Sequence, residues 1–205
     1  NVDGLQKVSP EINWTAHFQD LGLNKPGDFI VCQPDFFAEL GKMTKEIPVD
    51  AWKVYLQWQV LRSTSSYLST AFVNENFNFF GKTLTGQVAQ RPRWKRVQGS
   101  TSGALSEALG QLYVQKYFPA ESKKRMIDLV SNLRKSLGER IKQLTWMSDE
   151  TKAKALEKLD AITVKVGYPD KWRDYSALEV SDKSYIENVL KARKFDFDFM
   201  VSKIN

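Results

Sequence analysis

The sequence predicts an all-α fold with six to eight helices and at most one short strand or hairpin. Apolar residues recur at helical spacings of three and four along most of the chain. A hydrophobic content of 42% over 205 residues is enough for one sizeable core. No internal repeat, low-complexity linker or change in composition divides the chain. We therefore expect a single helical domain over residues 1–205.

The N-terminal part is expected to hold three helices and one short strand. Ser9 and Pro10 are typical of a helix start, which predicts a helix over residues 9–22. Residues 28–33 contain three consecutive apolar residues before a proline and favour a strand. A second helix is expected over residues 34–46. The longest helix then follows, with an apolar stripe at alternating spacings of four and three from residue 48 to residue 72.

Four further helices are expected in the C-terminal part. Apolar spacing predicts one helix around residues 104–112, which Pro119 ends, and a well-formed helix over residues 121–144. Ser148 is a suitable N-cap for the next helix, because acidic residues follow it in the first turn. A final helix is expected to start at residues 181–182.

The scarcity of histidine and cysteine excludes several kinds of chemistry. The chain has one histidine and one cysteine. A disulfide needs two cysteines, and a zinc finger or ribbon needs four ligands. The H-E-x-x-H zinc site of a metallopeptidase needs two histidines on one helix. We therefore expect no metal site within these residues.

The charge balance raises the question of an anionic partner. The net charge is +6, with 30 Lys and Arg against 24 Asp and Glu. Residues 91–96, Arg-Pro-Arg-Trp-Lys-Arg, place four cations and an indole side by side. This pattern fits a nucleic-acid surface that combines phosphate contacts with base stacking. It equally fits a helix entrance with solvated or paired cations and Trp94 in the core, and we favour this second interpretation because no groove-reading motif or phosphate-binding loop accompanies it.

The remaining candidate residues favour structural roles. His17 lies on an amphipathic helix without a nucleophile or acid at an activating spacing, and Cys32 is expected to be a buried, inert thiol in the short strand. The carboxylate pairs have simpler explanations or no partner motif; they are Asp149 with Glu150 and Asp196 with Asp198. Asn13-Trp14-Thr15 matches a glycosylation acceptor, which matters only in a secretory pathway that uses it. We assign no catalytic and no metal residue, and substrate-binding residues stay unknown.

Four separated sequence blocks resemble a known family. The blocks are residues 93–96 (Arg-Trp-Lys-Arg), 110–118 (starting Gly-Gln-Leu-Tyr-Val and ending in Phe), 144–152 (Leu-Thr-Trp-Met-Ser-Asp-Glu-Thr-Lys) and 166–170 (Val-Gly-Tyr-Pro-Asp). Their order and spacing are similar to the non-catalytic part of the neprilysin family of zinc metallopeptidases, which includes endothelin-converting enzyme and bacterial oligopeptidases. Residues 12–14, 18–22 and 55–58 fit more loosely. The resemblance covers essentially the whole chain.

The resemblance implies a piece of a larger enzyme. Family members continue into a thermolysin-like domain with N-A-[FY]-[YF], H-E-x-x-H and E-x-x-x-D motifs, and none of these occurs here. The resemblance therefore implies an incomplete helical cap region. In the family this region faces a C-terminal catalytic domain across a closed cavity and limits the size of peptide substrates. Zinc belongs to the intact parent, whereas the 205 residues are expected to be inactive alone.

One departure from the family bears on the source and location of the protein. Animal members have a disulfide-forming cysteine just after the W-[KR]-R block, where this chain has Val97. The resemblance therefore favours a bacterial member, working outside the cytoplasm, although a cytoplasmic location stays open. No apolar run reaches the ~20 residues of a membrane span. The chain starts at Asn1 and ends without a helix stop, so we expect a processed or truncated product with apolar helix faces left uncovered.

Three functions follow as hypotheses. The first is the cap region of a zinc endopeptidase that hydrolyses oligopeptides, with the missing catalytic domain and peptide substrates as partners and no nucleic acid. The second is a helical module that binds nucleic acid, another polyanion or a protein. The third is a structural helical scaffold.

Overall fold

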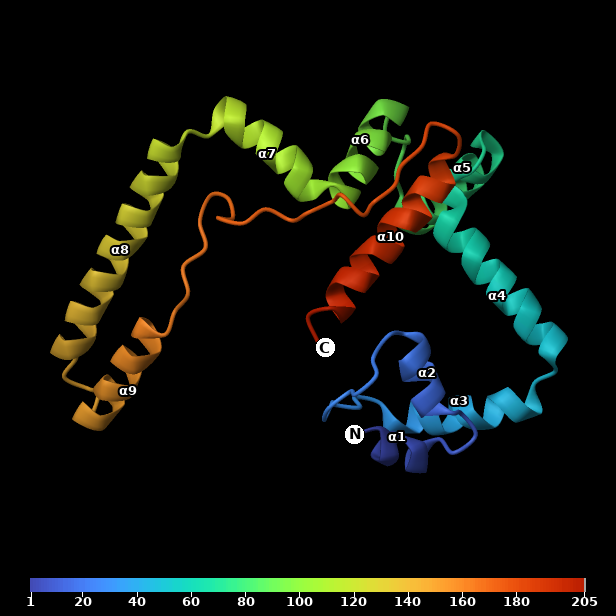
Figure 1. Ribbon diagram of the computed structural model, residues 1–205, viewed down its shortest axis with the longest axis horizontal. Coiled ribbons are helices and arrows are strands. Elements are labelled where there is room, and N and C mark those ends of the chain that lie inside the picture. Colours follow the sequence, from blue (N-terminus) through green and yellow to red (C-terminus); the bar gives the residue numbers. More distant parts are fainter. Residues whose placement is uncertain (205) are drawn as a thin grey trace. The chain divides into compact units, whose positions relative to one another are not determined.

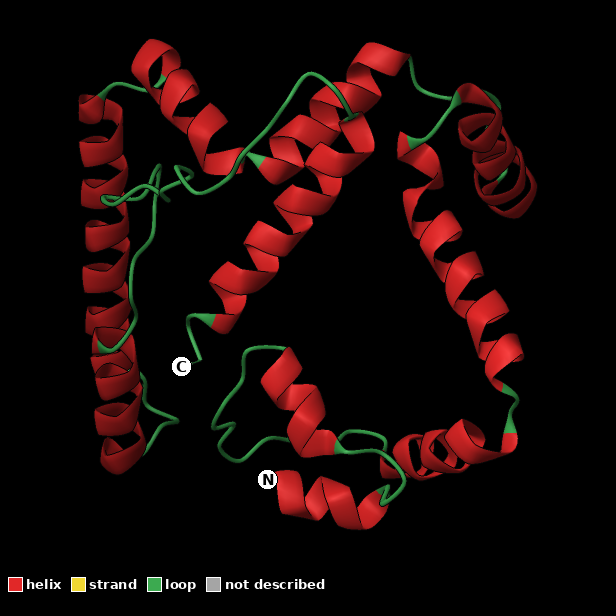
Figure 2. Cartoon of the chain, turned by 45° about the vertical axis from the view of Figure 1, so that its right-hand side comes forward, coloured by secondary structure: helices red, strands yellow, loops and turns green. Residues whose placement is uncertain are grey.

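The computed structural model describes residues 1–204, and within that range the chain is helical without a strand (Figures 1 and 2). The α-helices in this range are α1 (Val2–Val8), α2 (Trp14–Asp20), α3 (Pro34–Glu46), α4 (Val49–Thr64), α5 (Thr70–Asn76), α6 (Arg93–Ala104), α7 (Ser106–Tyr117), α8 (Ala120–Gln143), α9 (Asp149–Asp160) and α10 (Tyr185–Val201). The all-α prediction is confirmed. The expected number of six to eight helices is too low, because α1 and α6 were not predicted as separate helices and the stretch predicted as one helix from Pro48 is divided into α4 and α5.

Internal contacts divide the chain into two compact units. Unit 1 comprises Asn1–Gln98 and Ser176–Asn205, and unit 2 comprises Gly99–Tyr175. Compact contact units also occur inside one domain, so the single-domain organisation over residues 1–205 stays a prediction.

The predicted helix over residues 9–22 is wrong at its start. Ser9 instead ends α1, and its main-chain N–H donates to the Leu5 carbonyl oxygen. The Ser9 side chain is fully buried, and its carbonyl oxygen accepts a hydrogen bond of 3.0 Å from the Trp14 indole. Helix α2 starts only at Trp14, where the Asn13 side chain caps it by accepting from the main-chain N–H of Ala16. Trp14 and Leu5 are the buried apolar anchors of this N-terminal part.

The strand predicted for residues 28–33 does not form. The segment is irregular, and Ile30 is 89% exposed. A strand needs a neighbour to satisfy its main-chain groups, and no described segment pairs with this one. Phe29 is held only by a side-chain contact, with its ring centroid 5.4 Å from that of Phe18.

The long helix predicted from Pro48 ends at Thr64. The Thr64 hydroxyl donates to the Val60 carbonyl oxygen at 2.7 Å, and the Ser65 hydroxyl donates to that of Arg62 at 3.1 Å. Such hydroxyl groups compete for helix carbonyls and favour a bend or an end. A 3₁₀ turn over Ser65–Tyr67, helix α5 and a π-helix over Phe77–Thr83 follow.

Helix α10 packs against the 3₁₀ turn over Ser65–Tyr67 in unit 1. The Arg193 guanidinium lies 5.4 Å from the centroid of the Tyr67 ring and donates to the Ser63 carbonyl oxygen at 3.2 Å. Tyr67 also meets Tyr185 edge to face. Ala192, the neighbour of Arg193 on α10, is buried.

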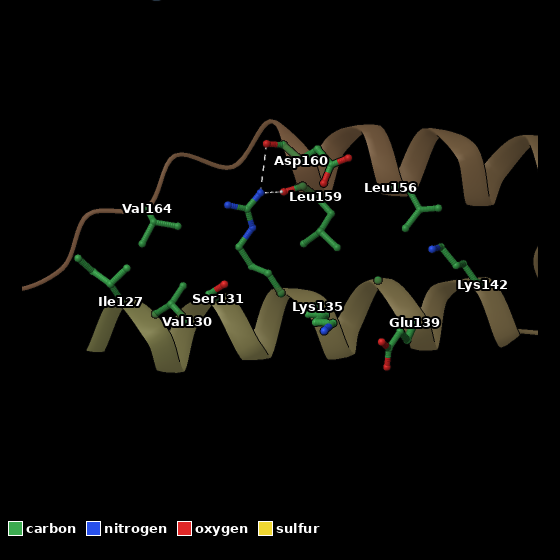
Figure 3. A pocket seen from close by; sticks show the side chains of 12 residues that line it. Ile127, Val130, Ser131, Lys135, Glu139, Lys142, Leu156, Leu159, Asp160 and Val164 are labelled. Atoms are coloured by element: carbon green, nitrogen blue, oxygen red, sulfur yellow. Dashed lines mark hydrogen bonds between the residues drawn. The ribbon is translucent and has the colours of Figure 1, made fainter. Parts of the chain in front are cut away.

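Unit 2 is built on the antiparallel hairpin of α8 and α9 (Figures 1 and 3). Helix α8 follows the predicted three-and-four pattern and is the longest described helix, with 24 residues. Ser148 caps α9 as predicted, because its hydroxyl oxygen accepts from the main-chain N–H of Thr151. Gly138 of α8 is buried where α8 faces Leu156 and Leu159 of α9.

Few apolar side chains are buried in the described chain. The buried hydrophobic residues are Leu5, Trp14, Val73, Leu159 and Ala192. The apolar stripes of the two long helices are exposed instead; they are Val54, Trp58 and Leu61 on α4 and Met126, Leu129, Leu133 and Leu137 on α8. Amphipathic helices bury their apolar face in a complete fold. Each stripe is therefore left uncovered within its own unit.

Candidate functional site

Lys123, near the start of α8, contacts the family-like block at residues 166–170. The Lys123 Nζ donates to the Tyr168 carbonyl oxygen at 2.8 Å and to the Asp170 Oδ1 at 2.6 Å. It also lies 4.4 Å from the centroid of the Tyr168 ring, within the range of a cation–π contact. The side chain is only 14% exposed. Lys123 thus holds the Val-Gly-Tyr-Pro-Asp turn onto α8 through three kinds of contact. We call the region around it, residues 107–123 and 166–175, the Lys123 clamp.

Within the clamp, aromatic rings connect the Val-Gly-Tyr-Pro-Asp turn to the block at residues 110–118, which starts on α7. Tyr168 stacks on Trp172 with ring centroids 5.9 Å apart, and Phe118 meets Tyr168 edge to face at 6.0 Å. The Trp172 ring also lies against Gly110 of α7, where an added Cβ would be 3.3 Å from the ring. The two blocks, about fifty residues apart in sequence, therefore form one cluster.

Glu107 secures the far end of the clamp. Its Oε2 accepts a hydrogen bond of 2.6 Å from the main-chain N–H of Arg173. Its own main-chain N–H faces the Tyr175 hydroxyl at 3.4 Å. The start of α7 thereby fixes the segment that follows the turn.

Electrostatics in the clamp stabilise an ion pair. The hydrogen bond from Lys123, and then its positive charge, hold the pKa of Asp170 below its ordinary value. The Lys123 ammonium is occupied by a carbonyl, a carboxylate and an aromatic ring. This arrangement anchors a loop and offers no free amine for nucleophilic catalysis.

A groove runs beside the clamp between α8 and α9 (Figure 3). It encloses about 710 Å³, and its wall includes Ile127, Val130 and Val164. Arg134 crosses it and donates from Nη2 to the carbonyl oxygens of Leu159 and Asp160, at 2.8 and 3.1 Å. Arg134 therefore satisfies the carbonyls at the C-terminus of α9, the end that favours a positive charge.

The other two family-like blocks lie outside the clamp. Residues 144–152 form the turn between α8 and α9 and the start of α9. Residues 93–96 open α6, where Trp94 is 64% exposed. The expectation that Trp94 enters the core is therefore wrong for the described chain. None of the cations at positions 91, 93, 95 and 96 pairs with a carboxylate among residues 1–204.

The single histidine and the single cysteine do not belong to a cluster of metal-binding side chains among the described residues. The His17 ring packs edge to face against Trp14 and Phe18, at centroid distances of 5.7 and 6.0 Å. Cys32 is exposed in the irregular segment, so the expected buried thiol is wrong. Asp198 is paired with Lys194 at 2.7 Å, and Asp149 lies 3.5 Å from Lys152.

The described residues do not fit a zinc site. No three of their His, Cys, Asp and Glu side chains are grouped so as to hold a metal ion within residues 1–204. The one histidine packs against aromatic rings instead. No helix in this range combines the length and apolar character that crossing a membrane requires.

Sequence reasoning missed the residues that build the clamp. No sequence pattern singles out Lys123, Glu107, Arg134 or Trp172 as site residues. The signal available in the sequence is the Gly-Tyr-Pro-Asp turn, whose Gly167 adopts φ +72°, a conformation that favours glycine.

Comparison with known proteins decides the family. The sequence model of peptidase family M13 matches residues 1–169. The chain belongs to peptidase family M13. This M13 chain is 29% identical to neprilysin-11 of Caenorhabditis elegans over 192 residues, covering 90% of the chain and 22% of that protein. It is 31% identical to rabbit (Oryctolagus cuniculus) neprilysin over 186 residues, covering 86% of the chain and 24% of that protein.

Solved structures support the same assignment. The M13 chain matches the Mycobacterium tuberculosis zinc metalloprotease Zmp1 in its open state with a TM-score of 0.88 and 34% identity. The match covers 98% of this chain and 32% of that one. The inhibitor complex of the same protease matches with a TM-score of 0.83 and 32% identity, covering 98% and 31%. The M13 chain spans between 22% and 30% of the length of its curated relatives.

Proposed function

We propose that this chain is the helical cap region of a zinc-dependent M13 endopeptidase that hydrolyses oligopeptides. The observation that carries the proposal is the match to Zmp1, in which nearly the whole chain aligns with about a third of a zinc metalloprotease. The cap itself is non-catalytic. Zinc, the catalytic domain and the peptide substrates belong to the intact protein, and zinc supplies an activated water for peptide-bond hydrolysis there.

The cap acts by exclusion. It encloses the catalytic cavity and limits the length of peptide that enters. A wall that excludes by size must keep its shape, and the Lys123 clamp supports this role because it fixes α7, α8 and residues 166–175 to one another. In this proposal, the contacts within unit 2 keep the wall of the catalytic cavity in a fixed shape.

The decisive experiment uses the full-length protein. We expect kcat/KM to fall steeply between short fluorogenic peptides and a long unfolded polypeptide that carries the same cleavage sequence. Lys123→Met, which loosens the clamp, should reduce this length discrimination while short-peptide cleavage persists. Lys124→Met is the matched control, because Lys124 pairs only with Asp128 on its own helix. Equal discrimination in all three proteins would contradict the role of the clamp, and absence of any length dependence would contradict the cap function.

The isolated chain provides a second test. The 205 residues with added zinc should not cleave a quenched oligopeptide. Turnover that a chelator abolishes, at stoichiometric zinc content, would contradict a non-catalytic role.

We also propose a bacterial protein that works outside the cytoplasm. Val97 stands where animal members have a disulfide cysteine, and the chain is 34% identical to the mycobacterial protease. Fractionation of the source cells with an antibody to this chain tests the location, and recovery only with cytoplasmic markers would contradict it.

One observation favours the alternative of a polyanion-binding module. Trp94 is exposed among cations that have no carboxylate partner in the described chain, as a stacking surface for nucleic acid requires. This alternative predicts binding to a random duplex that weakens steeply as salt rises. Lack of binding at low salt would exclude it.

A further inference from the structure

Residues 162–166, Ile-Thr-Val-Lys-Val, run beside α8 without helical structure, and after Ile162, whose N–H donates to the Leu159 carbonyl oxygen, their main-chain groups have no partners. No main-chain N–H of residues 163–167 donates a hydrogen bond, and none of their carbonyl oxygens accepts one. Figure 3 shows this segment passing over α8, with Val164 directed toward Ile127 and Val130. Main-chain groups of a folded protein are almost always paired or solvated, so five successive free residues form an open template.

The side chains of the segment alternate as in a strand. Apolar residues occupy positions 162, 164 and 166, whereas Thr163 and Lys165 stand between them. Ile162 is 49% exposed and Val164 is 36% exposed. Exposed β-branched residues on an unpaired strand promote pairing with another chain unless the protein covers them.

Both ends of the segment are fixed to α8. Arg134 holds the carbonyl oxygens of Leu159 and Asp160 just before it. Lys123 holds the Tyr168 carbonyl oxygen just after it. A segment fixed at both ends has already lost much of the conformational entropy that pairing would remove, so a partner strand binds it at a lower entropic cost.

We propose that residues 162–166 are an unpaired β-strand that pairs, main chain to main chain, with an extended segment of the same polypeptide outside these 205 residues. The inference rests on the proposed function in one respect, since it requires the longer M13 protein. The chain aligns with 32% of the Zmp1 chain, so about two thirds of that relative is available to supply such a segment. Lys165 favours an acidic residue opposite it on the partner strand.

Amide hydrogen exchange, read residue by residue by mass spectrometry, tests the pairing. In the 205-residue chain, the amides of residues 163–167 should exchange as freely as in an unfolded peptide. In the full-length protein, alternate amides should be protected by about a hundredfold or more, either at 163, 165 and 167 or at 164 and 166. The period of two arises because successive N–H groups of a strand point to opposite edges, and one partner strand covers one edge.

Three outcomes would overturn the inference. Fast exchange of all five amides in an active full-length peptidase excludes the partner strand and leaves the proposed function intact. Uniform protection without the period of two indicates simple burial. Protection in the 205-residue chain that disappears on dilution, or that appears only after a peptide substrate is added, identifies a second copy or the substrate as the occupant.

A variant distinguishes an effect on strand pairing at residues 162–166 from an effect on folding. Lys165→Glu keeps every main-chain donor and should lower the protection of the paired amides, because it places a carboxylate opposite the expected acid. Glu139→Lys, a charge change in the groove that Val164 also lines, is the matched control and should leave the protection unchanged. Equal protection in both variants would contradict the expected acidic partner residue.

Discussion

At the scale of single residues, Lys123 carries an unusual share of the contacts in unit 2. One ammonium group satisfies a carbonyl oxygen, a carboxylate and an aromatic face that all lie about 45 positions further along the chain. Removing it leaves the Tyr168 carbonyl without its donor. An unsatisfied, part-buried acceptor costs about 1–3 kcal/mol.

We predict that this ion pair makes stability depend on pH. The folded pKa of Asp170 lies below its unfolded value, so the ionised carboxylate stabilises the fold at neutral pH. That contribution is lost as the pH falls through the ordinary carboxyl range toward the folded pKa. Asp170→Asn should therefore be less stable than the wild type at neutral pH and nearly equal in acid, in urea unfolding at both pH values. A difference of the same size at both pH values would contradict the pair.

Residue roles were only partly predictable from the sequence. The cap at Ser148 depends on residues within one helical turn, and it was predicted correctly. Lys123 and Glu107 act on groups 45 and 66 positions away, and no local pattern records such distances. The exposed positions of Cys32 and Trp94 likewise depend on what covers them, which local sequence does not state.

At the scale of elements, two glycines show opposite constraints. Gly167 sits at φ +72°, and an added Cβ would also lie 3.1 Å from the Phe118 ring. Gly138 lies inside α8, where an added Cβ would meet Leu159 and Leu156 at 3.5 and 3.7 Å, which is ordinary contact. The first position requires glycine, and the second tolerates a methyl group.

We predict opposite signs for the matching alanine substitutions. Gly167→Ala should lower the free energy of unfolding by about 1–2 kcal/mol, because a Cβ disfavours the left-handed conformation. Gly138→Ala should raise it by about 0.5–1 kcal/mol through better helix propensity. Denaturant titration of the 205-residue chain measures both. Destabilisation by Gly138→Ala would mean that α8 and α9 pack more tightly than the contacts indicate.

Elements with a long, regular apolar pattern were the predictable ones. Helix α8 holds its three-and-four spacing over six turns, and its prediction is confirmed. The strand predicted at residues 28–33 is wrong because three apolar residues cannot make a strand without a partner. The single helix predicted from Pro48 to residue 72 is interrupted after Thr64, where the side-chain hydroxyls of Thr64 and Ser65 bond to carbonyls of the preceding turn, and helix resumes only at Thr70.

At the scale of the whole molecule, the most prominent feature is that the apolar faces of two long helices, α4 and α8, are exposed. Four apolar residues along one face of α8, at positions 126, 129, 133 and 137, are exposed, and so is the stripe on α4. Large contiguous apolar surfaces mark sites of association. Two whole-molecule properties were predictable from the sequence: the all-α fold class, from the apolar spacing, and the family resemblance, from the four sequence blocks.

We predict that the 205-residue chain self-associates in solution. Light scattering should show a mass that rises with protein concentration. Leu133→Lys, in the middle of the exposed α8 stripe, should reduce this rise without unfolding the helix. Arg140→Lys, a conservative change on the same helix, is the control and should behave as the wild type. A monodisperse monomer at all concentrations would contradict the prediction.

The two contacts that fix residues 162–166 also have a consequence for the order of folding. The Arg134 contact closes a loop of 25 positions to Leu159, and this loop lies inside the loop of 45 positions that Lys123 closes with Tyr168. Closing the inner loop first shortens the free chain that the outer contact must close, so its entropic cost falls. We expect unit 2 to form by zipping from the α8–α9 turn outward, with the Lys123 clamp as its last and most easily reopened contact.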